Sequence, residues 1–182
     1  MIDYLIITDE QLTNELENQL RQLFNSEYQA DYGEWTRKNP YGYASFDLRV
    51  LAISGNRVVG HAGCQKRRIL VNDMPVTIAG TGGILVDKAY RNQGIARQLL
   101  DHLQRASTRQ LGTSFGYLGC REAVVPFYEA CGYVRIDTEE HSLNRLTRQP
   151  EVSKGTPIMI CDGLQPASEF PNGIINLQGV PW

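Results

Sequence analysis

The chain has 182 residues, a formal net charge of −2 and an ordinary composition, with 42% apolar and 21% charged residues. This length predicts one domain with a substantial core. The small net charge gives no reason to expect nucleic acid or an acidic membrane as the main partner. No stretch approaches the length of a membrane span, and the first residues lack a secretory pattern, so we expect a cytoplasmic protein.

The four cysteines are scattered along the chain and include no Cys-x-x-Cys pair; they are Cys64, Cys120, Cys131 and Cys161. This spacing fits reduced thiols better than a disulfide framework or a zinc site. We therefore expect no bound metal.

The N-terminal half predicts a strand, a helix and a three-stranded antiparallel meander. Residues 2–8 form a short apolar run, and Thr8 or Asp9 can cap a helix that carries leucines at helical spacing and runs to about Phe24. Residues 28–46 break the pattern and form an aromatic loop, which either packs on the core as a lid or lines a ligand groove. Strands follow at 48–54, 57–71 and 76–86, separated by Gly-Asn and Asn-Asp turns.

The C-terminal half alternates helices and short strands. A helix with a broad apolar face is expected over about 93–109, a strand over 115–118, a helix over 122–130 that Gly132 ends, and a strand over 133–136. The tail, 150–182, is rich in Pro and Gly and contains brief apolar runs at 157–161 and 173–177. The order of elements predicts a mixed α/β domain built on one sheet.

The segment RNQGIA, residues 91–96, lies between a buried strand and an amphipathic helix. A helix N-terminus presents unpaired N–H groups and the positive end of a dipole, and it binds phosphates readily. Gly94 lets the backbone approach an anion, Ala96 keeps the next side chain small, and Arg91 can add charge. The segment is neither a P-loop nor the three-glycine dinucleotide fingerprint. Taken alone, it also fits a plain strand-to-helix turn.

Two motifs resemble those of the GNAT acyltransferases. RNQGIA matches the Arg/Gln-x-x-Gly-x-Gly/Ala motif of that family, and FYEACGY, residues 127–133, resembles its Phe-Tyr-x-x-x-Gly-Phe/Tyr element. The order of elements is also similar along most of residues 2–136. The resemblance implies an α/β (α+β) GNAT fold: a mixed, mostly antiparallel sheet with a splayed strand pair and flanking helices. It implies a single domain over 1–182, with a core to 137 and an extension, 138–182, that completes the acceptor site.

The same resemblance implies acetyl-CoA as the co-substrate. Its pantetheine arm would pair with the strand before the loop as an added strand does, and its pyrophosphate would meet the loop. The implied cofactor-binding residues are Ile84, Leu85, Val86, Arg91, Asn92, Gln93, Gly94, Ile95, Ala96 and Arg97. The N–H of Leu85 would steady the oxyanion, and Tyr128 would protonate the leaving thiolate as the catalytic acid. Alternatively, Tyr128 only packs against the cofactor.

An attacking amine must be neutral, so a base or a water chain must take its proton. The candidate bases are His61, Glu122, Glu34 and Asp162. His61 lies on a central strand where the acyl group should arrive, which makes it a candidate substrate contact. A single histidine within a strand is also commonly a packed structural residue, and Glu122 equally fits a favourable helix N-terminal charge.

Two subfamilies of acyltransferases are similar beyond these motifs. The aminoglycoside 2′-N-acetyltransferases resemble the chain in VVGHAGCQKRRI, in YRNQGIARQLL and in a terminal tryptophan, here Trp182. The nodulation N-acyltransferases resemble it in FDLRVLA, in SFGYLGCREAVVPFYEACGY and in EFPNGIINLQGVPW. Both subfamilies acylate an amine on a sugar. The resemblance therefore implies a small amine acceptor, an amino sugar or an aminoglycoside-like molecule, with a longer acyl donor as an alternative.

Gly82 and Trp182 are the remaining candidate substrate-binding residues. Gly82 stands where the aminoglycoside enzymes carry a glutamate, although a polycationic acceptor needs carboxylates. The glycines of AGTGG, residues 79–83, predict either an open floor beside the thioester or a β-bulge at the splayed strands. Trp182 either packs its indole in a groove or delivers a carboxylate to the acceptor amine.

Other functions stay open. The same fold could acetylate a protein or peptide, although such enzymes need an open groove that the aromatic loop would close. A CoA-binding module without catalysis is a further alternative. Homodimers are common among these enzymes, so a second copy of the chain is a candidate partner.

Overall fold

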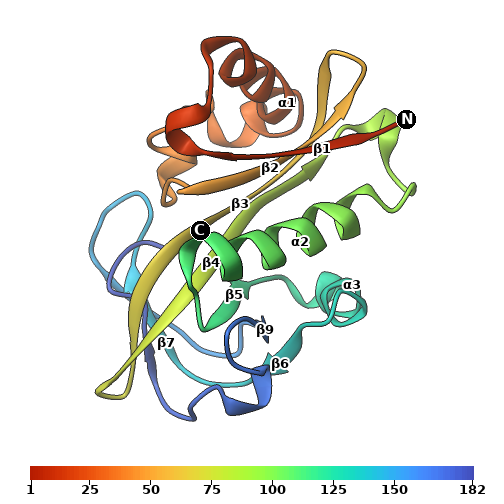
Figure 1. The fold of residues 1–182 in the computed structure, drawn as a ribbon. Helices are drawn as coiled ribbons and strands as arrows, with labels where there is room; N and C mark the ends of the chain where they lie inside the picture. Colours follow the sequence, from red (N-terminus) through yellow and green to blue (C-terminus); the bar gives the residue numbers. More distant parts are fainter.

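A long hairpin of β3 (Arg57–Val71) and β4 (Met74–Val86) forms the centre of the computed structural model, which describes all 182 residues (Figure 1). β2 (Leu48–Ser54) pairs with the first half of β3, and β1 (Asp3–Thr8) pairs with β2, all antiparallel. Turn dipeptides separate β2 from β3 and β3 from β4, and most buried positions of these strands are apolar, so the predicted meander forms.

The remaining strands complete a ten-stranded sheet, in which eight strands follow the order β6-β9-β5-β4-β3-β10-β7-β8 and β2 and β1 branch from β3. β5 (Phe115–Gly119) is parallel to β4, and β9 (Ile158–Asp162) lies between β5 and β6 (Val134–Ile136). β7 (Glu140–Leu143), β8 (Pro150–Ser153) and β10 (Ile175–Asn176) extend the sheet beside the second half of β3. The division expected at residue 137 therefore falls within one continuous sheet.

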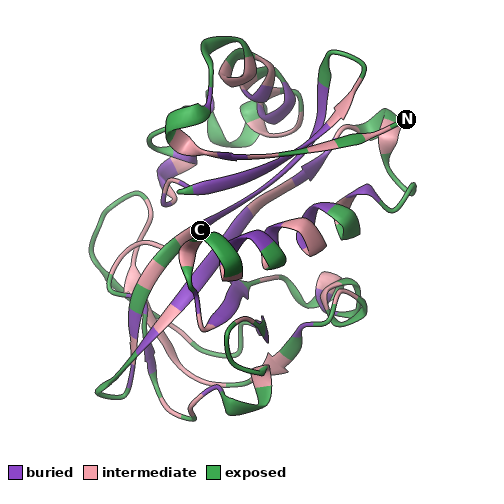
Figure 2. Cartoon of the chain, in the orientation of Figure 1, coloured by how far each residue is buried: buried purple, intermediate pink, exposed green.

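Two helices cover opposite faces of the sheet. α2 (Ile95–Ala106) packs on Leu48, Val50 and Ala52 of β2, whereas α1 (Asn14–Tyr32) packs on Leu51 from the alternate face. α3 (Val125–Ala130) covers β5 and β9. Figure 2 shows the result, with buried residues concentrated in the central strands and on the inner sides of the helices. Side-chain alternation along the strands thus supplies two separate apolar cores.

The helix boundaries differ from the predicted ones. α1 runs to Tyr32 rather than to about Phe24, because no Gly or Pro interrupts it before Gly33, whose φ of 81° ends it. Its N-cap is Thr13, whereas Thr8 caps a short 3-10 turn instead. The start of the expected aromatic loop is therefore helical. The other long helix begins at Ile95 rather than at residue 93, and it continues as a π-turn over Ser107–Leu111.

β4 and β5 diverge after only three paired positions. The last pair joins Gly80 to Tyr117, and β4 then continues to Val86 with a strand neighbour on the β3 side alone. On that side, the register shifts so that Gly83 and Ile84 together oppose Ala62. Gly83 has a φ of +60°, which suits a bulge. The expected splayed pair is thus present, and a β-bulge occupies the glycine segment.

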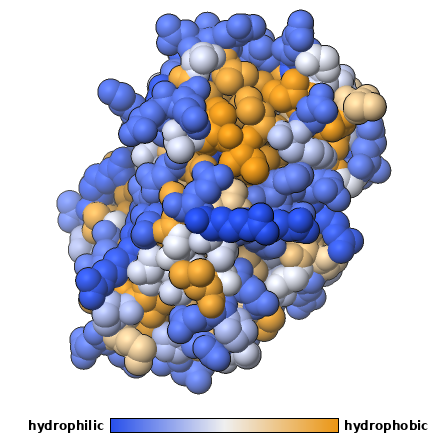
Figure 3. Space-filling model, viewed as in Figure 1, coloured by the Kyte–Doolittle hydropathy of each residue, from blue (hydrophilic) through white to orange (hydrophobic).

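The surface in Figure 3 is mostly polar in its lower half, with apolar side chains gathered around α1 and β1. β1 is an edge strand, and its Leu5 is 40% exposed. The helices of the structure are all too short or too polar to cross a membrane.

Candidate active site

A cavity of about 570 Å³ opens where β4 and β5 diverge. One side is formed by Thr81, Gly82, Gly83 and Ile84 of β4, and the opposite side by Leu118, Gly119, Cys120 and Arg121 at the end of β5. Nine aromatic side chains supply most of the remaining wall: Phe24, Tyr28, Tyr32, Tyr41, Tyr43, Phe46, Phe127, Tyr128 and Trp182. The splay therefore forms an apolar pocket with main-chain groups on one side.

Six of these aromatic residues come from residues 24–46, and the C-terminal segment holds this wall in place. Arg145 donates to the carbonyl of Tyr41 at 2.7 Å, and Arg148 donates to that of Gly42 at 2.9 Å. The N–H of Ala44 donates to the carbonyl of Pro181 at 3.0 Å. The aromatic segment was predicted either to pack on the core as a lid or to line a ligand groove. It does both, because it packs on the protein and lines the cavity.

Tyr128 lies on α3 and lines the same cavity as Ile84 of β4. Its ring packs edge-on against Phe127 and Tyr133, with centroids 5.2 and 5.7 Å away. Burial raises the pKa of the phenol, and the nearby Cys120 thiol adds to the effect. The hydroxyl therefore keeps its proton at neutral pH, as a proton donor must.

The loop before α2 gathers main-chain donors. Asn92 and Gly94 have φ values of 61° and 77°, and no N–H between Asn92 and Arg97 donates to a main-chain acceptor. Arg91 instead braces the loop: its Nε donates to the carbonyl of Val86 at 3.0 Å, and its guanidinium pairs with Glu27 at 3.0 Å. Arg97 is exposed and forms no ion pair. The ten predicted cofactor contacts thus lie along the end of β4, the loop that follows it and the first turn of α2, with free N–H groups that fit a pyrophosphate.

His61 does not reach the cavity. It is fully buried, with Nδ1 2.7 Å from the carbonyl oxygen of Gly83 and Nε2 3.3 Å from a guanidinium nitrogen of Arg49. Burial, with the Arg49 charge, lowers the pKa of His61 to about 3, although the Gly83 contact opposes the shift. The ring is therefore neutral, accepts from Arg49 and donates to Gly83. Its position supports the bulge from behind and leaves no nitrogen for an acceptor amine.

The other three candidate bases also lie off the cavity wall. Glu122 is exposed and pairs with Arg135, and Glu34 is exposed and lies 3.7 Å from Arg21. Asp162 accepts a hydrogen bond from the N–H of Ala167. The cavity wall carries neither a carboxylate side chain nor a histidine, and Arg121 is its one charged side chain.

Trp182 explains two of the glycines in residues 79–83. A Cβ on Gly80 would stand 2.0 Å from the indole, and one on Gly82 would stand 2.8 Å from the main-chain carbonyl carbon of Trp182. These glycines admit Trp182, so the floor is filled by its indole rather than open. The cause is a close approach by another part of the chain, which a glycine in a strand often marks.

Gln65 and Arg67 anchor Trp182, and neither residue was a sequence candidate. The indole N–H donates to Gln65 at 3.3 Å, and the guanidinium of Arg67 lies 4.1 Å from the ring centroid. Arg67 also donates to the carbonyls of Leu177 and Val180. Nothing in a single sequence marks this pair, because two polar residues on a strand ordinarily face solvent.

Replacing Gly80 with Ala should lower the melting temperature, because the new methyl group would overlap the indole of Trp182. A cost of about 1–3 kcal/mol is expected for such overpacking. Thermal unfolding of Gly80→Ala, Trp182→Ala and the double variant measures it. The double variant should be more stable than the sum of the single changes predicts. Additive losses would mean that the two residues do not touch.

No three His, Cys, Asp or Glu side chains gather in a way that could hold a metal ion, and all four cysteines are free thiols.

Solved structures with this architecture include several acyltransferases. ElaA from Escherichia coli superposes with a TM-score of 0.61 at 17% identity, over 88% of this chain and 98% of that one. An acyl-CoA N-acyltransferase from Pseudomonas aeruginosa gives 0.62 at 15% identity, over 88% and 99%. The GNAT family N-acetyltransferase YhbS from Escherichia coli, solved in complex with CoA, gives 0.58 at 16% identity, over 97% and 91%.

The splayed sheet with its flanking helices is the fold of the GNAT class of acyltransferases. The family model described as an acetyltransferase (GNAT) domain matches residues 47–135, which span β2 to β6. Residues 47–135 are thus similar to a GNAT acetyltransferase domain, and the motifs RNQGIA and FYEACGY lie inside the matched range.

Proposed function

We propose that this protein transfers the acetyl group of acetyl-CoA to a primary amine of a small acceptor, an amino sugar being the favoured class. The observation that carries the proposal is the splay of β4 and β5. It frees one edge of β4 and opens a cavity that Ile84 and the Tyr128 phenol both line, and the loop of free N–H groups follows the end of the same strand. YhbS, a structure of the same fold, is described in complex with CoA, which supports the choice of donor.

The main chain would hold the donor. The pyrophosphate would accept hydrogen bonds from the N–H groups of residues 92–97, at the positive end of α2. The pantetheine arm would run along Ile84 to Val86, where β4 has no strand on the β5 side. The thioester would then lie beside the cavity, between the bulge and α3.

The reaction needs only one protein proton donor. The amine nitrogen attacks the thioester carbonyl carbon, a C–N bond forms, and the C–S bond breaks as the amine loses a proton to water. The N–H of Leu85 would stabilise the oxyanion. Tyr128 would give its proton to the departing sulfur and recover one from solvent. The neutral phenol suits this role, since burial raises its pKa.

The aromatic wall supports a small acceptor over a protein. The segment 24–46 covers the cavity and is tied down by Arg145, Arg148 and Pro181, so an extended peptide would meet a closed side. Flat rings offer apolar surface to the face of a sugar, and the tyrosine hydroxyls offer hydrogen bonds to its hydroxyl groups.

Release of free thiol from acetyl-CoA tests the proposal. Glucosamine, an aminoglycoside, a polyamine and a short peptide would be supplied in turn, and acetyl-CoA binding would be measured separately by calorimetry. Thiol release that depends on an amino sugar supports the proposed reaction. Clear acetyl-CoA binding with no thiol release for any amine would contradict it and favour a CoA-binding module without catalysis.

A further inference from the structure

Four buried polar side-chain atoms have no hydrogen-bond partner within the protein: Trp35 Nε1, Arg49 Nε, Thr113 Oγ1 and the hydroxyl oxygen of Tyr41. Such atoms are rare in folded proteins, because each gives up its bonds to water without gaining a replacement. Of these four residues, only Tyr41 also lines the cavity. Its hydroxyl is therefore a hydrogen-bonding group that the protein itself leaves unused at the wall of the candidate active site.

The backbone of Tyr41 is held in an unfavourable conformation. Its φ of 56° and ψ of 29° lie in the left-handed region, which bulky residues rarely adopt and which clusters at functional sites where they do. Arg145 and Arg148 keep it there by donating to the carbonyls of Tyr41 and Gly42 at 2.7 and 2.9 Å. A Cβ on Gly42 would stand 2.5 Å from the carbonyl oxygen of Arg145, so this contact needs glycine. The C-terminal segment thus fixes the position of the Tyr41 ring.

A ligand can reach the Tyr41 ring from the side of Tyr32. The rings of Tyr28 and Tyr32 flank it, with centroids 6.1 and 5.6 Å away. Tyr32 is the last residue of α1 and is 46% exposed. Its ring can therefore turn aside for a ligand, since exposed side chains change rotamer within nanoseconds.

The chemistry of the Tyr41 hydroxyl suits an uncharged polar partner. Burial raises the pKa of Tyr41 to about 12, so the phenol is neutral at physiological pH and offers no negative charge to an ammonium group. A neutral phenol donates one hydrogen bond and accepts others, which matches the hydroxyl groups of a sugar.

We propose that Tyr41 is a specificity-determining residue that exchanges a hydrogen bond with a hydroxyl group of the acceptor. The cavity then selects a polyhydroxylated amine over an apolar amine of similar size, because only the hydroxylated amine gives the buried phenol a partner. This inference rests on the proposed acetyltransferase function and assigns the recognition of its acceptor to one residue.

Binding of two matched amines to Tyr41→Phe tests the inference. Glucosamine and cyclohexylamine each carry a primary amine on a six-membered ring, and calorimetry in the presence of CoA gives a Kd for each. The Kd of glucosamine should rise about tenfold in the variant, as expected for the loss of one hydrogen bond, and that of cyclohexylamine should stay within about twofold. Tyr4→Phe removes a hydroxyl outside the cavity and should change neither Kd.

An unchanged Kd for glucosamine, an equal rise for both amines, or no binding of glucosamine to the wild type would overturn the inference. Thiol release from acetyl-CoA is measured separately on the wild type. Its absence contradicts the proposed function, whereas the Kd values decide the role of Tyr41.

The stability of the protein without ligand gives a second readout, which a purely structural hydroxyl would move in the opposite direction. Tyr41→Phe removes a buried hydroxyl that has no partner within the protein, so the melting temperature should not fall although glucosamine binding weakens. A melting temperature clearly below that of the wild type would show that the hydroxyl stabilises the fold, through water for example, and would overturn the inference.

Discussion

Replacing Tyr128 with Phe should lower kcat by about a hundredfold or more while the KM for acetyl-CoA stays nearly constant. The phenyl ring keeps the edge contacts with Phe127 and Tyr133, so packing is preserved and only the hydroxyl is lost. Without that proton the thiolate must leave as an anion, which raises the barrier in the transition state alone. Steady-state kinetics with saturating amine measure the effect.

Tyr4→Phe is the matched control, since Tyr4 packs against His102 outside the cavity and should change neither constant. Weakened acetyl-CoA binding in Tyr128→Phe would make Tyr128 a donor contact rather than an acid. An unchanged kcat would exclude the acid role. Because burial raises the pKa of Tyr128, loss of its proton should cause no fall in wild-type kcat between about pH 7 and 9.

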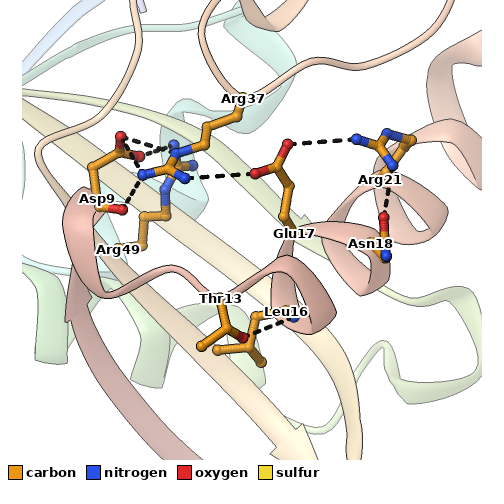
Figure 4. A network of polar contacts seen from close by, with 8 residues as sticks. All are labelled: Asp9, Thr13, Leu16, Glu17, Asn18, Arg21, Arg37 and Arg49. Carbon is orange, nitrogen blue, oxygen red and sulfur yellow. Dashed lines mark hydrogen bonds and ion pairs between the residues drawn. The ribbon is translucent and has the colours of Figure 1, made fainter.

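Replacing Asp9 with Asn should destabilise the fold by about 2–3 kcal/mol, because it leaves the Arg49 cation without a carboxylate (Figure 4). Arg49 is fully buried, Asp9 is its one carboxylate partner at 2.9 Å, and its Nε has no hydrogen-bond partner. Removing one partner of a fully buried pair costs about 3–5 kcal/mol, and the smaller figure allows for the 35% exposure of Asp9. Urea unfolding at neutral pH measures it.

Glu17→Gln is the control, because Glu17 pairs only with the partly exposed Arg21 and Arg37 and should cost less than about 1 kcal/mol. An equal loss of unfolding free energy in Asp9→Asn and Glu17→Gln would mean that the burial of Arg49 does not increase the cost of removing its partner.

Because of Asp9, the free energy of unfolding should also fall at acidic pH. Burial raises the pKa of this carboxyl, but hydrogen bonds from Arg37 and Arg49 outweigh burial and hold the pKa below its usual value. The pKa of Asp9 is lower in the folded protein than in the unfolded chain. Its contribution to the free energy of unfolding is therefore present above the unfolded pKa of about 3.9, and it is lost as the pH falls through the folded pKa. The difference in unfolding free energy between wild type and Asp9→Asn should therefore shrink below about pH 4. A constant difference down to pH 2 would contradict this.

The parts of the fold that local chemistry decides could be predicted from the sequence. Strand alternation and turn dipeptides specify the meander. The insertion of β9 between β5 and β6 could not be predicted, since it depends on pairing between segments far apart in the chain. The length of α1 was also missed, because its last two turns carry tyrosines that face the cavity rather than the periodic leucines of its first turns.

The residues proposed for the donor half follow one another along residues 84–97, so a local motif marks them, and their contacts with a donor stay a prediction. The residues around the acceptor side come from distant parts of the chain and carry no such motif. Trp182 meets Gly80 from the opposite end of the chain, and Arg67 binds the carbonyls that guide it there. The strand position of His61 agrees with the prediction, but its ring lies behind the bulge, against Arg49 and Gly83, and does not enter the cavity.

The position of β9 has a consequence for how the chain folds during synthesis. β5 and β6 leave the ribosome before Ile158–Asp162, the strand that pairs with both of them. Until β9 arrives, each of these strands presents an unpaired edge, and such edges template association with other chains. We expect the nascent chain to be most prone to aggregation in this interval, and refolding yield to fall as protein concentration rises.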